Sequence, residues 1–230
     1  MVNRGKTCIV LGFVMGCLAS PIAVSMASEP QRPEFDRVLD QKKENAIQNT
    51  SKLSATEVFE RLKDVDYIVD EYYMKKTIYN AFQHREIDGI ALSLQKLSLP
   101  EKEFTNGKTT HRSRDLYVVK KILESFPEIS ILKLLKLYES GDAVTKGNVI
   151  RVSGKLEGPA VDRLLIDALS DKTVCDQQDP EADGPPLRLC DLAYNQLVLR
   201  FQVKNVLRTL GPVQMIETRD YHIAVLKGRL

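Results

Sequence analysis

Histidine is the side chain that most often performs acid–base chemistry near neutral pH, and this chain contains three. His84, His111 and His222 stand far apart in polar surroundings, and none has a second histidine or a cysteine four residues away. The sequence contains no glycine-rich phosphate loop, no Gly-x-Ser-x-Gly and no His-Glu-x-x-His motif. We therefore interpret the histidines as surface residues, and we expect neither catalysis nor a cofactor.

An acidic segment near residue 180 is the best candidate for a ligand site. Asp179, Glu181 and Asp183 are spaced like the first, third and fifth ligands of a calcium loop, and Gly184 stands at the sixth position. The pattern then fails, because two prolines follow and Cys190 occupies the twelfth position, where calcium needs a bidentate glutamate. We keep the three acids as a candidate ligand loop, interpret it as a solvated loop, and expect no metal.

The composition is that of an ordinary globular chain. It has 230 residues, of which 43% are hydrophobic and 28% charged, and this excludes a disordered tail, a multi-pass membrane protein and a collagen-like fibre. Removing Arg4 and Lys6 from the 33 basic residues leaves as many basic as acidic residues, 31 each, from residue 28 onward. Because a nucleic-acid protein needs an excess of positive charge, we expect no nucleic acid as partner.

Residues 1–27 have the pattern of a secretory signal peptide. A positive start is followed by a short apolar run and by small residues that end at Ala27, after which we predict cleavage. Two alternatives remain: an uncleaved membrane anchor, and a lipoprotein acylated at Cys17, which follows a lipobox-like Val-Met-Gly. We expect an exported protein, periplasmic or extracellular, that contacts the membrane only if Cys17 is lipidated or the signal is uncleaved.

Only two cysteines remain after removal of this signal. Cys8 and Cys17 leave with it, and Cys175 and Cys190 stay in one short segment. Their separation of 15 residues does not fit a Cys-x-x-Cys redox pair or a zinc site. In an oxidising compartment such a pair is expected to form a structural disulfide.

The rest of the chain indicates a polar leader and then helices. Residues 28–53 are polar and contain two prolines, which predicts a flexible leader. From residue 54 to 230 we predict a helical domain that begins at a Ser54–Glu57 capping box. Apolar residues recur at helical spacing, and the predicted helices include 55–63, 66–82, 86–97 and a segment ending at Leu210. Residues 101–113 read as a polar loop.

Prolines at the predicted helix starts suggest a repeat. Helices are predicted to stop where Pro127, Pro159 and Pro212 open the next one, since proline is tolerated in a first helical turn but not in the interior. A step of 32 residues relates Pro127 to Pro159 and also pairs Leu132 with Leu164. Helical hairpins with such a period bury their apolar faces by stacking on each other, so we predict an all-α fold built as an α-solenoid.

Two short motifs in this region resemble HEAT repeats. Asp171 at the end of one predicted helix and Arg188 with Ala193 in the next look like the Leu-x-Asp turn and the Val-Arg…Ala opening of that family. The segments 171–175 and 186–195 are similar to those of HEAT-like proteins that bacteria export. The resemblance extends over roughly residues 115–212 and implies a protein-binding or scaffolding surface without catalysis.

These motif residues also have simple structural roles. We expect Asp171 to close a turn, Arg188 to reach carbonyls or acids of a neighbouring unit, and Ala193 to let two helices approach. Asp191 is predicted to be the N-cap of a helix that begins there.

The function that follows is an exported HEAT-like binding or scaffold protein of the cell envelope, with another protein or an envelope component as partner. A small helical-bundle hydrolase and a lipid-anchored structural protein of the envelope are the two alternatives.

Overall fold

The computed structural model describes residues 34–63, 70–98, 109–175 and 184–230, and of residues 34–37, 39 and 109–113 it gives the backbone alone. These ranges contain ten α-helices, one short 3-10 helix and no strand, which confirms the prediction of an all-α fold. The helices are α1 (Glu34–Gln48), η1 (Asn49–Lys52), α2 (Ala55–Leu62), α4 (Glu71–Phe82), α5 (Glu86–Ser98), α7 (Thr109–Ser125), α8 (Pro127–Ser140), α9 (Ala143–Ser153), α10 (Pro159–Ala168), α11 (Leu189–Arg200) and α12 (Ile216–Lys227).

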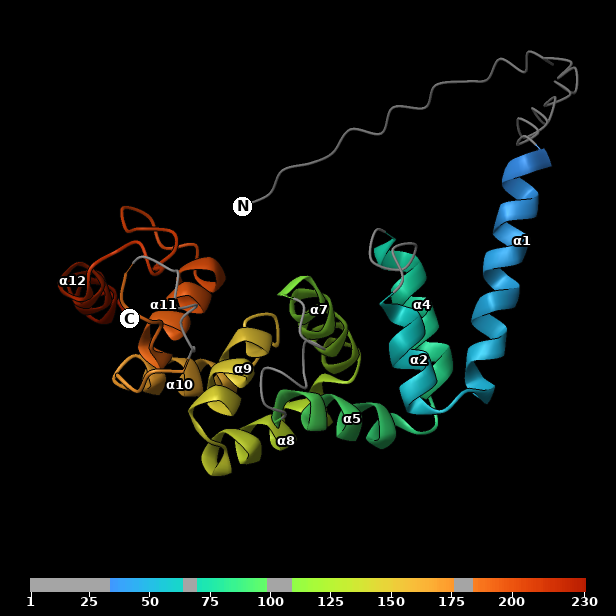
Figure 1. Ribbon diagram of the computed structural model, residues 1–230, viewed down its shortest axis with the longest axis horizontal. Coiled ribbons are helices and arrows are strands. Elements are labelled where there is room, and N and C mark those ends of the chain that lie inside the picture. Colours follow the sequence, from blue (N-terminus) through green and yellow to red (C-terminus); the bar gives the residue numbers. More distant parts are fainter. Residues whose placement is uncertain (1–33, 64–69, 99–108, 176–183) are drawn as a thin grey trace, which may run out of the picture.

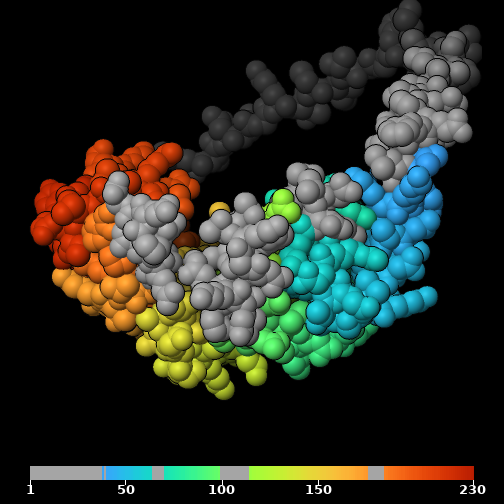
Figure 2. Space-filling view, in the orientation of Figure 1, coloured from blue at the N-terminus to red at the C-terminus, as the bar shows by residue number. Residues whose placement is uncertain are grey.

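The helices follow a curved path (Figure 1). Helices α1, α2 and α4 form one arm, α5 and α8 lie along the base, and α9 to α12 form the other arm. Helix α7 lies inside the curve, where it contacts α4, α5, α8 and α9. The space-filling view shows the same curved outline (Figure 2). Because α7 packs against both arms, it holds the two arms in position relative to each other.

Two of the three prolines start helices as predicted. Pro127 and Pro159 occupy the first turns of α8 and α10. Pro212 does not, because it lies in a turn and α12 begins only at Ile216.

Helices α8 to α11 form two hairpins that lie side by side. Helix α8 contacts α9 in the first hairpin and α10 contacts α11 in the second, while α8 also contacts α10 and α9 contacts α11. The buried faces are not related by the predicted step of 32. Leu132 is 65% exposed although Leu164 is buried, whereas a step of 31 relates buried Leu134 to buried Leu165. The step of 32 residues thus relates the starts of α8 and α10, whereas a step of 31 residues relates their buried leucines.

The predicted helix that ends at Leu210 is absent from the structure. Helix α11 stops at Arg200, and residues 201–215 form turns in which Gln202 and Asn205 have positive φ angles of 48° and 58°. Asn195 of α11 holds this segment by donating to the carbonyl of Leu210 at 2.9 Å and accepting from its amide at 2.6 Å. The side-chain amide of Asn195 therefore forms, with the backbone of Leu210, hydrogen bonds that other backbone groups would form in a helix.

Part of the predicted flexible leader is helical instead. Residues 34–52 form α1 and η1, which pack against α4. Ile47 is buried, and its carbonyl accepts a 2.7 Å hydrogen bond from Asn80 of α4. Because this contact depends on one apolar residue and several polar ones, hydrophobic periodicity does not reveal it. Residues 28–33, like the predicted signal peptide 1–27, lie outside the described ranges.

Among the helices that the structure describes, none combines the length and the apolar character that a membrane crossing requires.

Candidate functional site

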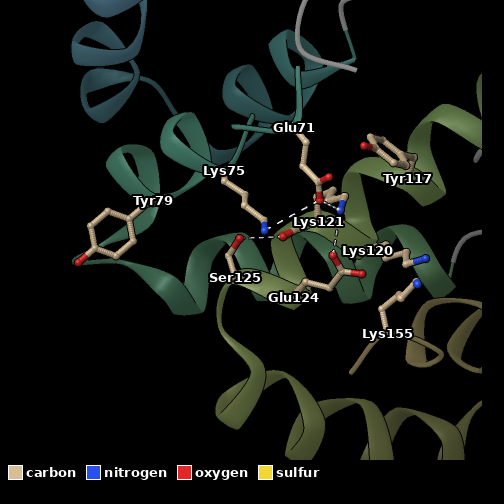
Figure 3. A pocket seen from close by; sticks show the side chains of 9 residues that line it. All are labelled: Glu71, Lys75, Tyr79, Tyr117, Lys120, Lys121, Glu124, Ser125 and Lys155. Atoms are coloured by element: carbon tan, nitrogen blue, oxygen red, sulfur yellow. Dashed lines mark hydrogen bonds and ion pairs between the residues drawn. The ribbon is translucent and has the colours of Figure 1, made fainter. Parts of the chain in front are cut away.

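A hollow of about 730 Å³ opens between α4 and α7 (Figure 3). Helix α4 forms one wall, α7 forms the other, and the turn between α9 and α10 contributes one lysine. The lining residues are Glu71, Lys75, Tyr79, Tyr117, Lys120, Lys121, Glu124, Ser125 and Lys155. Four lysines against two glutamates leave an excess of two positive charges in this hollow.

Two of the four lysines make ion pairs with glutamates of the hollow. Lys75 lies 3.9 Å from the carboxylate of Glu71, and Lys121 is held more closely. The ammonium of Lys121 lies 2.6 Å from the carboxylate of Glu71 and 3.2 Å from that of Glu124. Burial by itself would lower the pKa of Lys121, but the hydrogen bonds that it donates to the two glutamates outweigh burial and raise it. The same hydrogen bond from Lys121 lowers the pKa of Glu71. Lys121 therefore ties α7 to α4 across the hollow as a permanent charge.

Lys120 and Lys155 are not neutralised in this way. Neither makes an ion pair with any residue in the described part of the chain, and their side chains approach the same corner of the hollow (Figure 3). Lys120 is half-buried, and burial lowers its pKa. The negative charge of Glu124 acts against this effect, and the positive charges of Lys155 and Lys121 add to it. A carboxylate placed between Lys120 and Lys155 would relieve their repulsion.

Two tyrosines add apolar surface to the lysine-lined walls. Tyr79 of α4 is 62% exposed. The ammonium of Lys121 lies 5.6 Å from the ring centroid of Tyr117. Aromatic rings and unpaired cations together suit a ligand that carries both carboxylates and apolar groups.

The motif residues build a different structure, a buried cluster of charges at α11 and α12. Arg188 donates to both carboxylate oxygens of Asp191, at 3.2 and 2.9 Å, and Arg219 of α12 donates to the same carboxylate at 2.8 Å. Asp191 and Arg219 are fully buried. Arg219 also donates to the carbonyls of Pro185 and Gln214, at 2.5 and 2.8 Å. We call Arg188, Asp191 and Arg219 the charge clamp, because together they hold α12 onto α11.

The charge clamp shows where the predicted motif residues lie. Asp191 is not the N-cap, since α11 begins at Leu189 and Arg188 occupies the cap position. The carboxylate of Asp191 instead reaches back one turn and accepts from the backbone amide of Arg188 at 3.0 Å. Asp171 accepts from the amide of Thr173 at 2.9 Å in the turn that follows α10. Ala193 is fully buried in α11.

The expected disulfide between Cys175 and Cys190 is not formed in the structure, in which both residues are buried. The two lie on paired segments but out of register. Cys175 donates its amide to the carbonyl of Leu187, whereas Cys190 donates its amide to the carbonyl of Asp171. The pairing of the two segments thus places another residue opposite each cysteine, so Cys175 and Cys190 do not face each other.

The thiols of Cys175 and Cys190 are therefore expected to resist labelling in the folded protein. Burial raises the pKa of Cys190 to about 11, so little reactive thiolate exists near pH 8. A thiol reagent followed by peptide mapping should leave both residues unmodified in native buffer and modify both in denaturant without reductant. If neither residue reacted in denaturant until reductant was added, the two would be joined by a disulfide.

Asp220 of α12 gives the charge clamp a pH dependence. Its carboxylate accepts from Lys172 at 2.8 Å and lies 2.8 Å from Arg188. The hydrogen bond from Lys172, and after it the contact with Arg188, lowers the pKa of Asp220 below its ordinary value of 3.8. A group with a depressed folded-state pKa stabilises the fold above its ordinary pKa and loses that contribution as the pH falls through the lower, folded-state value.

We therefore expect Asp220→Asn to be less stable than the wild type at neutral pH, and expect this difference to shrink as the pH is lowered below the ordinary pKa of 3.8. Urea denaturation of both proteins across this pH range measures the difference. A difference that stayed constant with pH would show that the charge of Asp220 does not contribute.

The remaining predicted residues do not join a described site. Asp179, Glu181 and Asp183 lie outside the described residues. His84 is exposed, and His222 packs edge-on against Tyr221, so neither lines the hollow. Within the described ranges, no group of three or more histidine, cysteine or acidic side chains is placed to hold a metal ion.

Sequence reasoning missed the hollow entirely. Lys75, Lys120, Lys121 and Lys155 belong to three separate segments, and each follows a pattern that an exposed helix face would also give. The adjacent pairs Lys75-Lys76 and Lys120-Lys121 are local signals, but they do not distinguish a binding site from a solvated surface. Comparison of the chain with protein-family models, with curated proteins and with solved structures gives no match, so the site stands on its geometry alone.

Proposed function

We propose that this chain is an exported, HEAT-like binding or scaffold protein of the cell envelope, and that the hollow between α4 and α7 holds an acidic segment of a partner protein. The observation that carries the proposal is the pair of lysines, Lys120 and Lys155, that share one corner of the hollow and make no ion pair with any described residue. Carboxylates of a partner would form those ion pairs.

The arrangement of the helices supports binding at a preformed surface. Lys121 bridges Glu71 and Glu124, so the two walls of the hollow are already joined before a ligand arrives. A preformed site loses little conformational entropy on binding. The two hairpins α8–α9 and α10–α11, which contact each other helix by helix, support the solenoid part of the proposal.

Binding of fluorescent poly-glutamate to the full chain tests this function. We expect binding that weakens as salt is added, because exposed charges are screened. The double variant Lys120→Glu with Lys155→Glu should bind about tenfold more weakly, since each exposed ion pair contributes up to about 1 kcal/mol.

A matched control uses two lysines on another face. Lys133 and Lys136 are exposed on α8 and line no part of the hollow, so Lys133→Glu with Lys136→Glu makes the same change of net charge elsewhere. We expect this control to bind like the wild type. Equal loss of binding in both double variants would mean that net charge alone attracts the probe. If a single-stranded DNA of the same charge bound equally well, the hollow would bind polyanions in general and not an acidic protein segment. Either result would contradict the proposal.

A further inference from the structure

A second hollow of about 470 Å³ adjoins the first. Its lining residues are Gly154, Lys155, Glu157, Asp162, Leu199, Arg200, Phe201 and Gln202. Lys155 belongs to both linings, so the two hollows meet at this side chain. The second hollow lies between the α9–α10 turn, α10 and the end of α11.

The charges of the second hollow are largely compensated. Arg200 lies 2.5 Å from the carboxylate of Asp162 and also donates to the carbonyl of Leu156 at 2.5 Å. Glu157 carries a charge opposite to that of Lys155 in the same lining. This hollow therefore offers a ligand little net charge, in contrast to the excess of positive charge between α4 and α7.

The second hollow instead presents large apolar side chains. Leu199 is 65% exposed and Phe201 is 44% exposed, and both stand at the end of α11. Gln202 follows with a positive φ of 48°, so the chain leaves the helix axis directly after Phe201. The turn thus leaves Leu199 and Phe201 accessible at the helix end, where a ligand could cover them.

We propose that the two hollows form one groove that takes an extended segment of a partner protein with two chemical halves: carboxylates over Lys120 and Lys155, and an apolar side chain over Leu199 and Phe201. This inference rests on the proposed function and adds what determines specificity. Charge complementarity selects the acidic half. The exposed apolar surface at the end of α11 selects the other half, because covering it removes apolar area from water.

The test compares two synthetic peptides on the full chain by fluorescence anisotropy. The first is a short run of glutamates, and the second is the same run followed by a Gly-Ser spacer and a Leu-Phe pair, made in both chain orders. We expect one order of the second peptide to bind about tenfold more tightly than the first. The variant Leu199→Ser with Phe201→Ser should remove this gain and leave binding of the glutamate peptide unchanged.

Leu132→Ser is the matched control for this loss. Leu132 is 65% exposed, as Leu199 is, but it lies on α8 and lines neither hollow. We expect Leu132→Ser to keep the full gain. Far-ultraviolet circular dichroism and melting temperature of each variant show whether its fold is retained.

The outcomes separate the two proposals. In two of them the glutamate peptide binds, but the Leu-Phe pair adds no affinity in either order, or adds affinity that Leu199→Ser with Phe201→Ser retains. In both cases the proposal of one continuous groove is wrong and the proposed function stands. If neither peptide binds the wild type, both proposals are wrong. The variant Lys120→Gln with Lys155→Gln supplies a further test. If it bound both peptides as tightly as the wild type does, both proposals would be wrong, because the glutamates would then bind at another site.

Discussion

Replacing Asp191 with alanine is expected to lower the free energy of unfolding by about 3–5 kcal/mol and the melting temperature by about 10 °C. The carboxylate of Asp191 is fully buried and contacts the guanidinium groups of both Arg188 and Arg219. Its loss leaves the buried charge of Arg219 with carbonyl partners only, and a buried charge without a counter-ion is strongly destabilising. Urea denaturation followed by circular dichroism measures the change.

Asp220→Asn is the matched control for Asp191→Ala. Asp220 contacts Arg188 as well, but its side chain is 33% exposed, so an ion pair there contributes at most about 1 kcal/mol. We expect the two variants to differ severalfold in the free energy that they lose. Equal losses would mean that burial of Asp191 does not matter and that the charge clamp is an ordinary surface network.

The second large effect is expected from Phe82→Ala, which should lower the free energy of unfolding by about 3–5 kcal/mol. Phe82 ends α4 and is fully buried, and a Cβ at Gly89 of α5 would lie only 3.1 Å from its ring. The ring thus fills the space where α4 and α5 approach closely. Removing it leaves a cavity that the backbone contact at Gly89 cannot close.

Phe82→Leu is the control that keeps most of the volume, and we expect it to cost about 1 kcal/mol. Hydrogen exchange should locate the effect of Phe82→Ala in α4, which carries Lys75 and Tyr79 of the hollow. A loss of stability spread evenly over the chain, with no increase of exchange in α4, would contradict this assignment. Poly-glutamate binding at a temperature where the variant is folded should also weaken, because one wall of the hollow has loosened.

These two variants lie in different arms of the fold. Phe82 stabilises the arm of α4, and the charge clamp stabilises the arm of α11 and α12 (Figure 1). The hollow lies between α4 and α7, and the second hollow reaches α11. We therefore expect Phe82→Ala to weaken the acidic half of the groove, and Asp191→Ala to weaken the half that contains Phe201.

Helices α2, α5, α8 and α10 could be predicted from the sequence because their signals are local. The serine hydroxyl and glutamate carboxylate of the capping box at Ser54 are three residues apart, and the box is present at the start of α2. Pro127 and Pro159 mark helix starts because a proline ring affects only its own turn. Apolar spacing likewise identified α2 and α5 to within a residue at each end, since one face of each is buried.

Three of the errors have one cause, a partner distant in the sequence. Residues 201–215 have helical spacing but are held in turns by Asn195. Residues 34–52 look like a leader but pack on α4 through Asn80 and Ile47. The two cysteines look like a bonded pair, and the register of the segments that contain them keeps each opposite another residue. Local sequence carries no information about such partners.

Composition and spacing by themselves determined that the chain is helical and where α2, α5, α8 and α10 begin. The tertiary structure alone decided that Arg219, 28 residues beyond Asp191, completes the charge clamp, and that lysines from three segments share one hollow. The physical reason is range: capping and amphipathic burial act within a turn or two of one helix. Charges combine into a site only where packing brings separate helices within a few ångströms of each other.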